Sequence, residues 1–144
     1  MLPRLVSAKD NAQRQTHAFT HRLAALGFRG DMETDEGART VASTDNSIYQ
    51  VKPAAILYPR GADDLKTIAT VMSEAAFSDI TIAPRGGGTG TNGQSLTSGV
   101  VVDCSRHMHR ILEIDPVRRV ARVEAGVVKD QAGAVQLGDG GDQR

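Results

Sequence analysis

Small and apolar residues near the start of the chain recur at the spacing of one helix face. They are separated by three or four positions, at Ala12, Thr16, Phe19, Leu23 and Leu26. Gly27 follows the last of them, and glycine is the residue that most often ends a helix in a left-handed turn. The pattern therefore predicts an amphipathic helix that ends at Gly27 and packs one face against the rest of the chain.

The next stretch, residues 30–46, is polar and carries no hydrophobic period. Its carboxylates lie close together, at Asp31, Glu33, Asp35 and Glu36. A site for a hard cation needs a defined ladder of oxygen ligands, which this spacing does not provide. We expect a solvated loop here and no metal site, so that residues 1–46 form a first segment made of a helix and a polar loop.

Short apolar runs alternate with one helical stripe in the middle of the chain. Residues 54–58, 80–83 and 100–103 have the length and composition of buried strands. Asp63 and Asp64 start the stripe, where the positive end of a helix dipole favours acidic residues. The stripe itself consists of Leu65, Ile68, Ala69, Met72 and Ala76. Strand, helix and strand in this order favour a parallel sheet with a right-handed crossover.

Two further runs, residues 111–115 and 119–125, flank a turn-like segment and predict an antiparallel hairpin. The fold class is therefore α+β, with a small parallel βαβ sheet and flanking helices followed by the hairpin. We assign residues 47–131 to this second segment. Residues 132–144 are small, polar and glycine-rich, and we expect them to form a poorly ordered tail.

The main chemical signal lies in residues 84–93, which contain five glycines, one cation and no carboxylate. Consecutive glycines allow left-handed backbone angles and remove Cβ atoms, so that successive N–H groups can point into one concavity. A guanidinium next to them suits a phosphoryl oxygen. The composition predicts a phosphate-binding loop with the candidate residues Arg85, Gly86, Gly87, Gly88, Thr89, Gly90, Thr91 and Asn92.

The type of loop follows from what comes after it. Residues 88–93 match the G-x-G-x-x-G dinucleotide fingerprint, but that fingerprint must open a helix. Residues 94–99 instead lead directly into the next apolar run, and no Gly-Lys-Ser/Thr of a Walker A loop follows the glycines. We expect a strand, a glycine loop and a strand, in which loop amides bind a pyrophosphate. A flexible surface turn is the alternative interpretation.

These residues resemble a known flavoprotein domain. Residues 84–90 are similar to the pyrophosphate loop of the FAD-binding domain shared by the p-cresol methylhydroxylase and vanillyl-alcohol oxidase flavoproteins. Tyr49 with residues 54–60, and residues 123–127, resemble other segments of that domain in the same order. Residues 85–94 and 103–108 look closest to large bacterial FAD and iron–sulfur oxidoreductases of the D-2-hydroxyglutarate and D-lactate dehydrogenase type.

The resemblance covers about residues 31–131 and implies a function. Intact relatives oxidise a 2-hydroxy acid by hydride transfer to FAD, and they continue with a second glycine-rich stretch, a substrate domain and cysteine clusters. This chain matches only the N-terminal part of such an FAD-binding domain, so we expect it to bind FAD as part of an FAD-linked oxidoreductase and to be inactive alone. The alternatives are a non-enzymatic module that binds phosphate or a nucleotide, and a non-functional gene fragment.

The cofactor expectations are equally specific. Some relatives attach FAD through a histidine beside the glycine loop, and none stands there in this sequence, so FAD should bind non-covalently. An iron–sulfur cluster is expected only in full-length relatives, because Cys104 alone cannot hold one. We assign no catalytic residue and no metal ligand.

Composition excludes several other partners. The chain has 17 basic and 17 acidic residues, which gives no electrostatic reason to bind nucleic acid or an anionic membrane. No apolar run is long enough to span a membrane, and a single cysteine cannot form an internal disulfide, so we expect a cytoplasmic location. A sheet edge left uncovered after the hairpin would allow self-association.

The remaining reactive side chains have simpler interpretations. His17 and His21 are four residues apart, but they lack a third zinc ligand, so an exposed helical pair is expected. His107 and His109 stand among arginines and predict a solvated turn. Cys104 follows three valines and is expected to be a small buried hydrophobic residue rather than a nucleophile.

Overall fold

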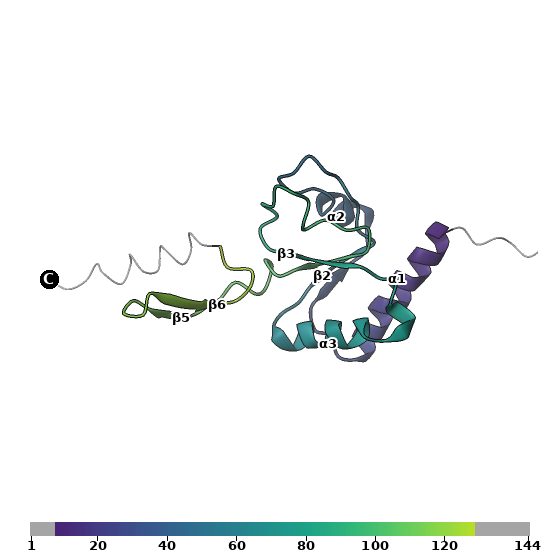
Figure 1. Cartoon of the computed structure of the whole chain (residues 1–144). Coiled ribbons are helices and arrows are strands. Elements are labelled where there is room, and N and C mark those ends of the chain that lie inside the picture. Colours follow the sequence, from purple (N-terminus) through teal and green to yellow (C-terminus); the bar gives the residue numbers. More distant parts are fainter. Residues whose placement is uncertain (1–7, 129–144) are drawn as a thin grey trace, which may run out of the picture.

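Two β-sheets and the helices around them make up residues 8–128, the part of the chain that the computed structural model describes (Figure 1). The helices are α1 (Ala8–Ala25), α2 (Glu36–Val41), α3 (Ala62–Met72) and the short 3₁₀-helix η1 (Ala75–Phe77). The strands are β1 (Asp31–Glu33), β2 (Ala55–Tyr58), β3 (Ile82–Arg85), β4 (Val100–Asp103), β5 (Ile111–Asp115) and β6 (Val120–Val123). The first four strands form one sheet in the order β1-β2-β4-β3, and β5 pairs with β6 in the second.

The predicted first helix is present and ends as expected. Phe19 and Leu23 of α1 are fully buried, and burial of an apolar side chain of this size stabilises a fold by about 1.5–3 kcal/mol. Gly27 has a φ of 81°, and the Phe28 N–H donates to the Leu23 carbonyl at 3.1 Å. This is the hydrogen-bond pattern of a helix that ends at a left-handed glycine, which confirms the predicted cap. Leu26, by contrast, is exposed.

The four-stranded sheet has the parallel centre that the sequence predicts. β2 and β3 both pair with β4 in parallel, with Leu57 and Pro84 each opposite Val102. β3 begins at Ile82, two residues later than the apolar run, and extends to Arg85, which lies opposite the last residue of β4. Pairing with β4, rather than local hydrophobicity, therefore sets the ends of this strand.

Side chains of the central strands alternate between two faces, and each face has its own apolar cluster. On one face Leu57 and Val102 pack with residues of α1 and α3. On the other face Ile56 and Val101 pack with Ala42, which directly follows α2. Helices α1 and α3 therefore cover one side of the sheet and α2 covers the other, as Figure 1 shows.

The expectation of a solvated loop at residues 30–46 is wrong. β1 lies in this stretch and pairs antiparallel with β2, and α2 follows it. The Asp35 carboxylate caps α2 by accepting the Ala38 N–H at 2.9 Å, a local signal that favours a helix start. β1 is only three residues long, and its partner strand lies more than twenty residues further on, so no local pattern marks it.

One carboxylate at the start of α3 has a role beyond the helix dipole. Asp64 is buried, and its two oxygens accept the N–H groups of Arg29 at 2.9 Å and Arg60 at 2.8 Å. The side chain thereby joins the segment after α1 to the turn after β2. The acidic start of the predicted helix is confirmed, and Leu65 and Ile68 pack inward as expected.

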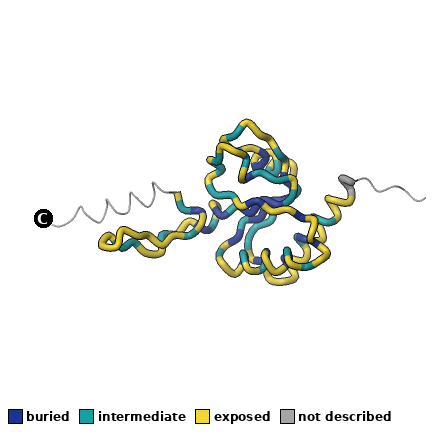
Figure 2. Tube along the Cα trace, in the orientation of Figure 1, coloured by how far each residue is buried: buried dark blue, intermediate teal, exposed yellow. Residues whose placement is uncertain are grey.

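The predicted hairpin is present as β5 and β6, with an irregularity of register between Ile111 and Glu113. Arg119, in its turn, has a φ of 56°. Figures 1 and 2 show that the hairpin projects from the four-stranded sheet, and all of β6 is exposed. The α+β class with a parallel centre and a following hairpin is confirmed. The tail expected at residues 132–144 lies outside the described residues.

Candidate functional site

The glycine loop runs from the carboxyl end of β3 to the amino end of β4. Residues 86–99 between the two strands contain no helix, so the predicted order of strand, loop and strand is confirmed. A Rossmann arrangement, in which the glycines open a helix, is absent from this part of the described chain. Any anion held here is held by loop groups rather than by a helix N-terminus.

Arg85 lies at the base of this loop, and its guanidinium turns back into the protein. Nη1 donates to the carbonyl of Thr44 at 2.9 Å, and Nε lies 3.8 Å from Oδ2 of Asp103. The Arg85 and Asp103 side chains are 15% and 14% exposed. Arg85 therefore joins the glycine loop to the segment after α2 and to the end of β4.

Two glycines of the loop are required by the fold itself, and a third has a close side-chain neighbour. Gly88 has a φ of 65°, and a Cβ there would lie 2.4 Å from Nη2 of Arg85. Gly93 has a φ of 72° and lies against the ring of Tyr49. A Cβ on Gly90 would lie 2.6 Å from the amide of Gln94, which ends a flexible and exposed side chain that can move away. Left-handed angles account for glycine at positions 88 and 93.

Gly86 and Gly87 have no such internal requirement. Neither has a positive φ, and the nearest atom to a Cβ on Gly86 would be the Ala125 carbonyl oxygen at 4.0 Å. A Cβ on Gly87 would make an ordinary contact of 3.8 Å with the methyl group of Thr89. Close approach of a ligand to the backbone is a physical reason for glycine that remains here. Gly86 and Gly87 therefore leave open backbone at the start of the loop.

Residues 43–50 hold the far side of the loop, although the sequence did not single out this segment as part of the site. Ser95 donates to Oδ2 of Asp45 at 3.1 Å, and the Asn92 N–H donates to the side-chain oxygen of Gln94 at 3.1 Å. Hydrogen bonds from Ser47, with smaller contributions from Ser95 and the charge of Arg85, hold the pKa of Asp45 below its usual value. Residues 43–50 therefore form one wall of the loop, and only the resemblance at Tyr49 had pointed to them.

The base of the hairpin returns to the same place. The Gly126 N–H donates to the Met108 carbonyl at 2.7 Å, and a Cβ on Gly126 would lie 2.3 Å from the Cys104 carbonyl oxygen. Ala125, just before it, is the residue nearest to a Cβ on Gly86. The structure thus brings the end of the hairpin beside the start of the glycine loop, although the two are about forty residues apart in the sequence.

A second polar cluster lies at the edge formed by β1 and the carboxyl end of β2. His107 lies in the predicted turn, but its Nε2 is 2.7 Å from Asp31 Oδ2 and its side chain is only 23% exposed, so the expectation of a solvated side chain is wrong. Arg106 pairs with Glu33 at 2.8 Å and lies 3.3 Å from the centre of the Tyr58 ring. Hydrogen bonds to His107 and Arg60 lower the pKa of the Asp31 carboxyl. The cluster joins β1 to the turn after β4 through long-range contacts.

The other reactive side chains stand as the sequence predicts. Cys104 is buried, and burial raises the pKa of its thiol, which disfavours a nucleophilic role. His17, His21 and His109 are exposed.

Residues 8–128 contain no group of three or more side chains of the kind that hold a metal ion. None of the helices in this range combines the length and apolar character needed to cross a membrane.

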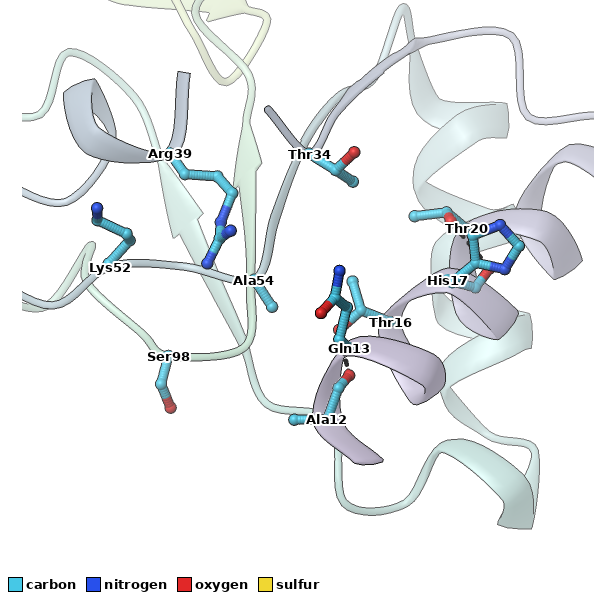
Figure 3. A pocket seen from close by; sticks show the side chains of 10 residues that line it. All are labelled: Ala12, Gln13, Thr16, His17, Thr20, Thr34, Arg39, Lys52, Ala54 and Ser98. Carbon is cyan, nitrogen blue, oxygen red and sulfur yellow. Dashed lines mark hydrogen bonds between the residues drawn. The ribbon is translucent and has the colours of Figure 1, made fainter. Parts of the chain in front are cut away.

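A cleft of about 640 Å³ lies beside α1, near the amino ends of β2 and β4 (Figure 3). It is lined by Ala12, Gln13, Thr16, His17, Thr20, Thr34, Arg39, Lys52, Ala54 and Ser98. Lys52 and Arg39 both pair with Glu36, and Arg39 Nε also donates to the Pro53 carbonyl at 2.7 Å. Of residues 86–99, Ser98 at the end of the loop lines this cleft, and none of the glycines does.

Comparisons with known proteins identify the domain family. A family model described as an FAD binding domain matches residues 53–136. D-2-hydroxyglutarate dehydrogenase of Pantoea ananatis is 54% identical over 134 residues, which cover 93% of this chain and 13% of that protein. The enzyme of the same name from Escherichia coli is 47% identical over 131 residues, which cover 91% of this chain and 13% of that protein. The chain thus spans a small part of these relatives.

Solved structures show the same fold. An alkyldihydroxyacetonephosphate synthase matches with a TM-score of 0.69 at 19% identity, over 87% of this chain and 25% of that chain. A 4-ethylphenol oxidase from Gulosibacter chungangensis matches with a TM-score of 0.66 at 22% identity, over 96% of this chain and 27% of that chain. Both similarities concern the arrangement of helices and strands.

Proposed function

The chain belongs to the FAD-binding domain family, and from this premise we propose that its glycine loop holds the pyrophosphate of FAD. The proposed site consists of Arg85, Gly86, Gly87, Gly88, Thr89, Gly90, Thr91 and Asn92. Backbone N–H groups of the loop provide the donors, because hydrogen bonds to an ionised oxygen are the strong ones. FAD binds non-covalently, since residues 84–99 include no histidine that a flavin could be attached to.

One observation carries this proposal: the absence of side chains at Gly86 and Gly87 where the fold leaves room for them. A folded chain gains about 0.4–1 kcal/mol when a glycine of unstrained conformation is replaced by alanine. Glycine at both positions therefore lowers stability without serving the fold. A phosphate group that packs directly on the backbone supplies the compensating interaction.

We propose that this segment contributes the phosphate-binding part of an oxidoreductase that oxidises a 2-hydroxy acid of the D-2-hydroxyglutarate or D-lactate type. Support comes from the relatives, whose names give D-2-hydroxyglutarate dehydrogenase activity. FAD supplies the acceptor for the hydride when it is bound. The chain's own residues bind and orient the cofactor, and we assign none of them to the chemical step.

The location and self-association of the chain are also proposals. We place it in the cytoplasm, because a single cysteine fits a compartment that keeps thiols reduced. The projecting hairpin exposes Val117 and Val120 and has unpaired strand edges, so we propose that it mediates self-association.

Titration of the purified 144-residue chain with FAD, ADP and riboflavin tests the cofactor proposal. We expect FAD and ADP to bind and riboflavin, which lacks phosphate, to bind far more weakly. Gly86→Val and Gly87→Val should weaken FAD binding at least about tenfold, since each side chain occupies the place of a phosphate. Gly61→Val is the matched control, because its φ of 174° is ordinary extended backbone and a Cβ there meets no atom within 4 Å.

Two results would contradict the proposal. The first is equal FAD affinity of the loop variants and the control. The second is equal binding of riboflavin and FAD, which would exclude recognition through the pyrophosphate. Tight binding of ADP without any gain for FAD would favour the alternative of a nucleotide-binding module without redox chemistry.

A further inference from the structure

The Arg85 guanidinium is held by protein groups on two sides. Nη1 donates to the Thr44 carbonyl at 2.9 Å, Nε faces the Asp103 carboxylate at 3.8 Å, and Nη2 lies directly beneath Gly88. A guanidinium has five N–H donors in a rigid fork, so each of these contacts restricts the direction of the others. A hydrogen bond to Thr44 and an ion pair with Asp103 therefore hold the guanidinium beside Gly88.

Asp103 is itself held in place. Its Oδ1 accepts both the N–H of Ser105 at 2.8 Å and the hydroxyl of the same residue at 2.6 Å. Its Oδ2 is the atom that faces Arg85. A continuous chain of polar contacts thus runs from the turn after β4 through Asp103 and Arg85 to the backbone at Thr44.

The charges in this chain of contacts balance locally. The Arg85 and Asp103 side chains are only 15% and 14% exposed, so solvent screens them little. The carboxylate offsets the field of the guanidinium at any phosphate above the loop. As the main cation for a diphosphate, Arg85 would be weakened by the neighbouring carboxylate. As a residue that shapes the loop, it is instead held in place by that carboxylate.

We infer that Arg85 and Asp103 form a positioning pair that sets the conformation of the FAD phosphate loop, with Arg85 acting through Gly88 rather than as the main ligand of the phosphate. This inference rests on the proposed function of the loop. It assigns Asp103, which the sequence did not mark as a site residue, a role in cofactor binding. It also explains why position 88 requires glycine, since the guanidinium lies where a Cβ would be.

Positioning and direct binding predict opposite effects for Asp103→Asn. If Arg85 bound the phosphate directly, removing the neighbouring negative charge would leave FAD affinity unchanged or raise it. If the pair positions the loop, the same substitution weakens FAD binding. Arg85→Lys makes a second distinction, because lysine keeps the charge and can bind phosphate as a point charge but lacks the fork.

The experiment measures FAD and ADP affinity for the wild-type chain and for Arg85→Lys, Arg85→Ala and Asp103→Asn. Arg22→Ala is the control, because Arg22 makes an exposed ion pair with Glu74 at 2.8 Å on the opposite side of the sheet from α2. We expect at least about a tenfold loss for Arg85→Lys and for Asp103→Asn, and no loss for the control. The losses of FAD affinity in Arg85→Ala and Asp103→Asn should not add in the double variant, since both substitutions break the same contact.

A second readout needs no cofactor. In ¹⁵N spectra of the free protein, the amide signals of Gly86, Gly87 and Gly88 should shift in Arg85→Lys and in Asp103→Asn while those of β2 stay in place. Near-wild-type affinity of Arg85→Lys together with unchanged or tighter binding by Asp103→Asn would overturn the inference. If the wild-type chain binds no FAD, the proposed function fails. If the glycine amide signals do not shift in Arg85→Lys and Asp103→Asn, the pair does not position the loop, whatever the result for FAD.

Discussion

Alanine at two neighbouring glycines of the loop should separate stability from cofactor binding. Gly88→Ala places a residue with a Cβ at a φ of 65°, where an L-residue is strained by roughly 1–2 kcal/mol. The new Cβ would lie 2.4 Å from Nη2 of Arg85, so the guanidinium has to leave its position. Its hydrogen bond to the Thr44 carbonyl is charge-assisted, and losing such a bond costs about 1.5–3 kcal/mol.

The two contributions add to at most about 5 kcal/mol, and we expect Gly88→Ala to lose at least about 2 kcal/mol of unfolding free energy. Gly87→Ala differs in both respects, because its φ is not positive and its Cβ makes only a 3.8 Å contact with Thr89. Its stability should be unchanged or higher by about 0.4–1 kcal/mol, while its FAD affinity falls about tenfold.

Urea unfolding followed by circular dichroism measures the first quantity, and titration with FAD measures the second. Equal slopes of the unfolding free energy against urea in the two variants would show that the same structure unfolds in both. The reasoning is refuted if Gly88→Ala is as stable as Gly87→Ala. It is also refuted if Gly87→Ala binds FAD as tightly as the wild-type chain.

Three further outcomes are expected. The pKa of Asp45 is lowered from 3.8 by its hydrogen bonds to Ser47, so its contribution to stability is complete above about pH 4 and is lost as the pH falls through the lower folded value. Asp45→Asn should therefore flatten the stability profile in that acidic range, and an unchanged profile would contradict the assignment. The 144-residue chain should not oxidise D-2-hydroxyglutarate or D-lactate with a dye acceptor, and turnover above a control without protein would contradict this. Hydrogen exchange should be fast throughout β5 and β6 and slow at Ile56 and Val101, because a two-stranded hairpin is marginal in water; equal protection would show that the hairpin is stable by itself.

The parts of the fold that the sequence could predict depend on residues that are close together in the chain. The apolar spacing up to Gly27 gave α1 and its cap, and the glycines between two apolar runs gave a loop without a helix. These features depend on backbone angles and on contacts within a few positions. The resemblance at residues 84–90 added the cofactor, which no composition could have supplied.

The parts that sequence could not predict depend on distant partners. β1 exists because Asp31 and Glu33 pair with β2 in the backbone and with arginines and a histidine in the side chains. Nothing next to Asp103 indicates that it faces Arg85 across a parallel pair of strands. Register between strands, which is set by the whole sheet, brings such residues together.

The lack of side chains at Gly86 and Gly87 has a consequence for mutational mapping. An alanine scan finds binding residues by deleting side-chain atoms, and Gly86 and Gly87 have none to delete. Scanning Thr89, Thr91 and Asn92 in that way would leave the backbone donors in place and report a tolerant surface. Substitutions that add volume at the glycines, alanine included, would detect this part of the proposed site, and they would mark residues without side chains as the most sensitive.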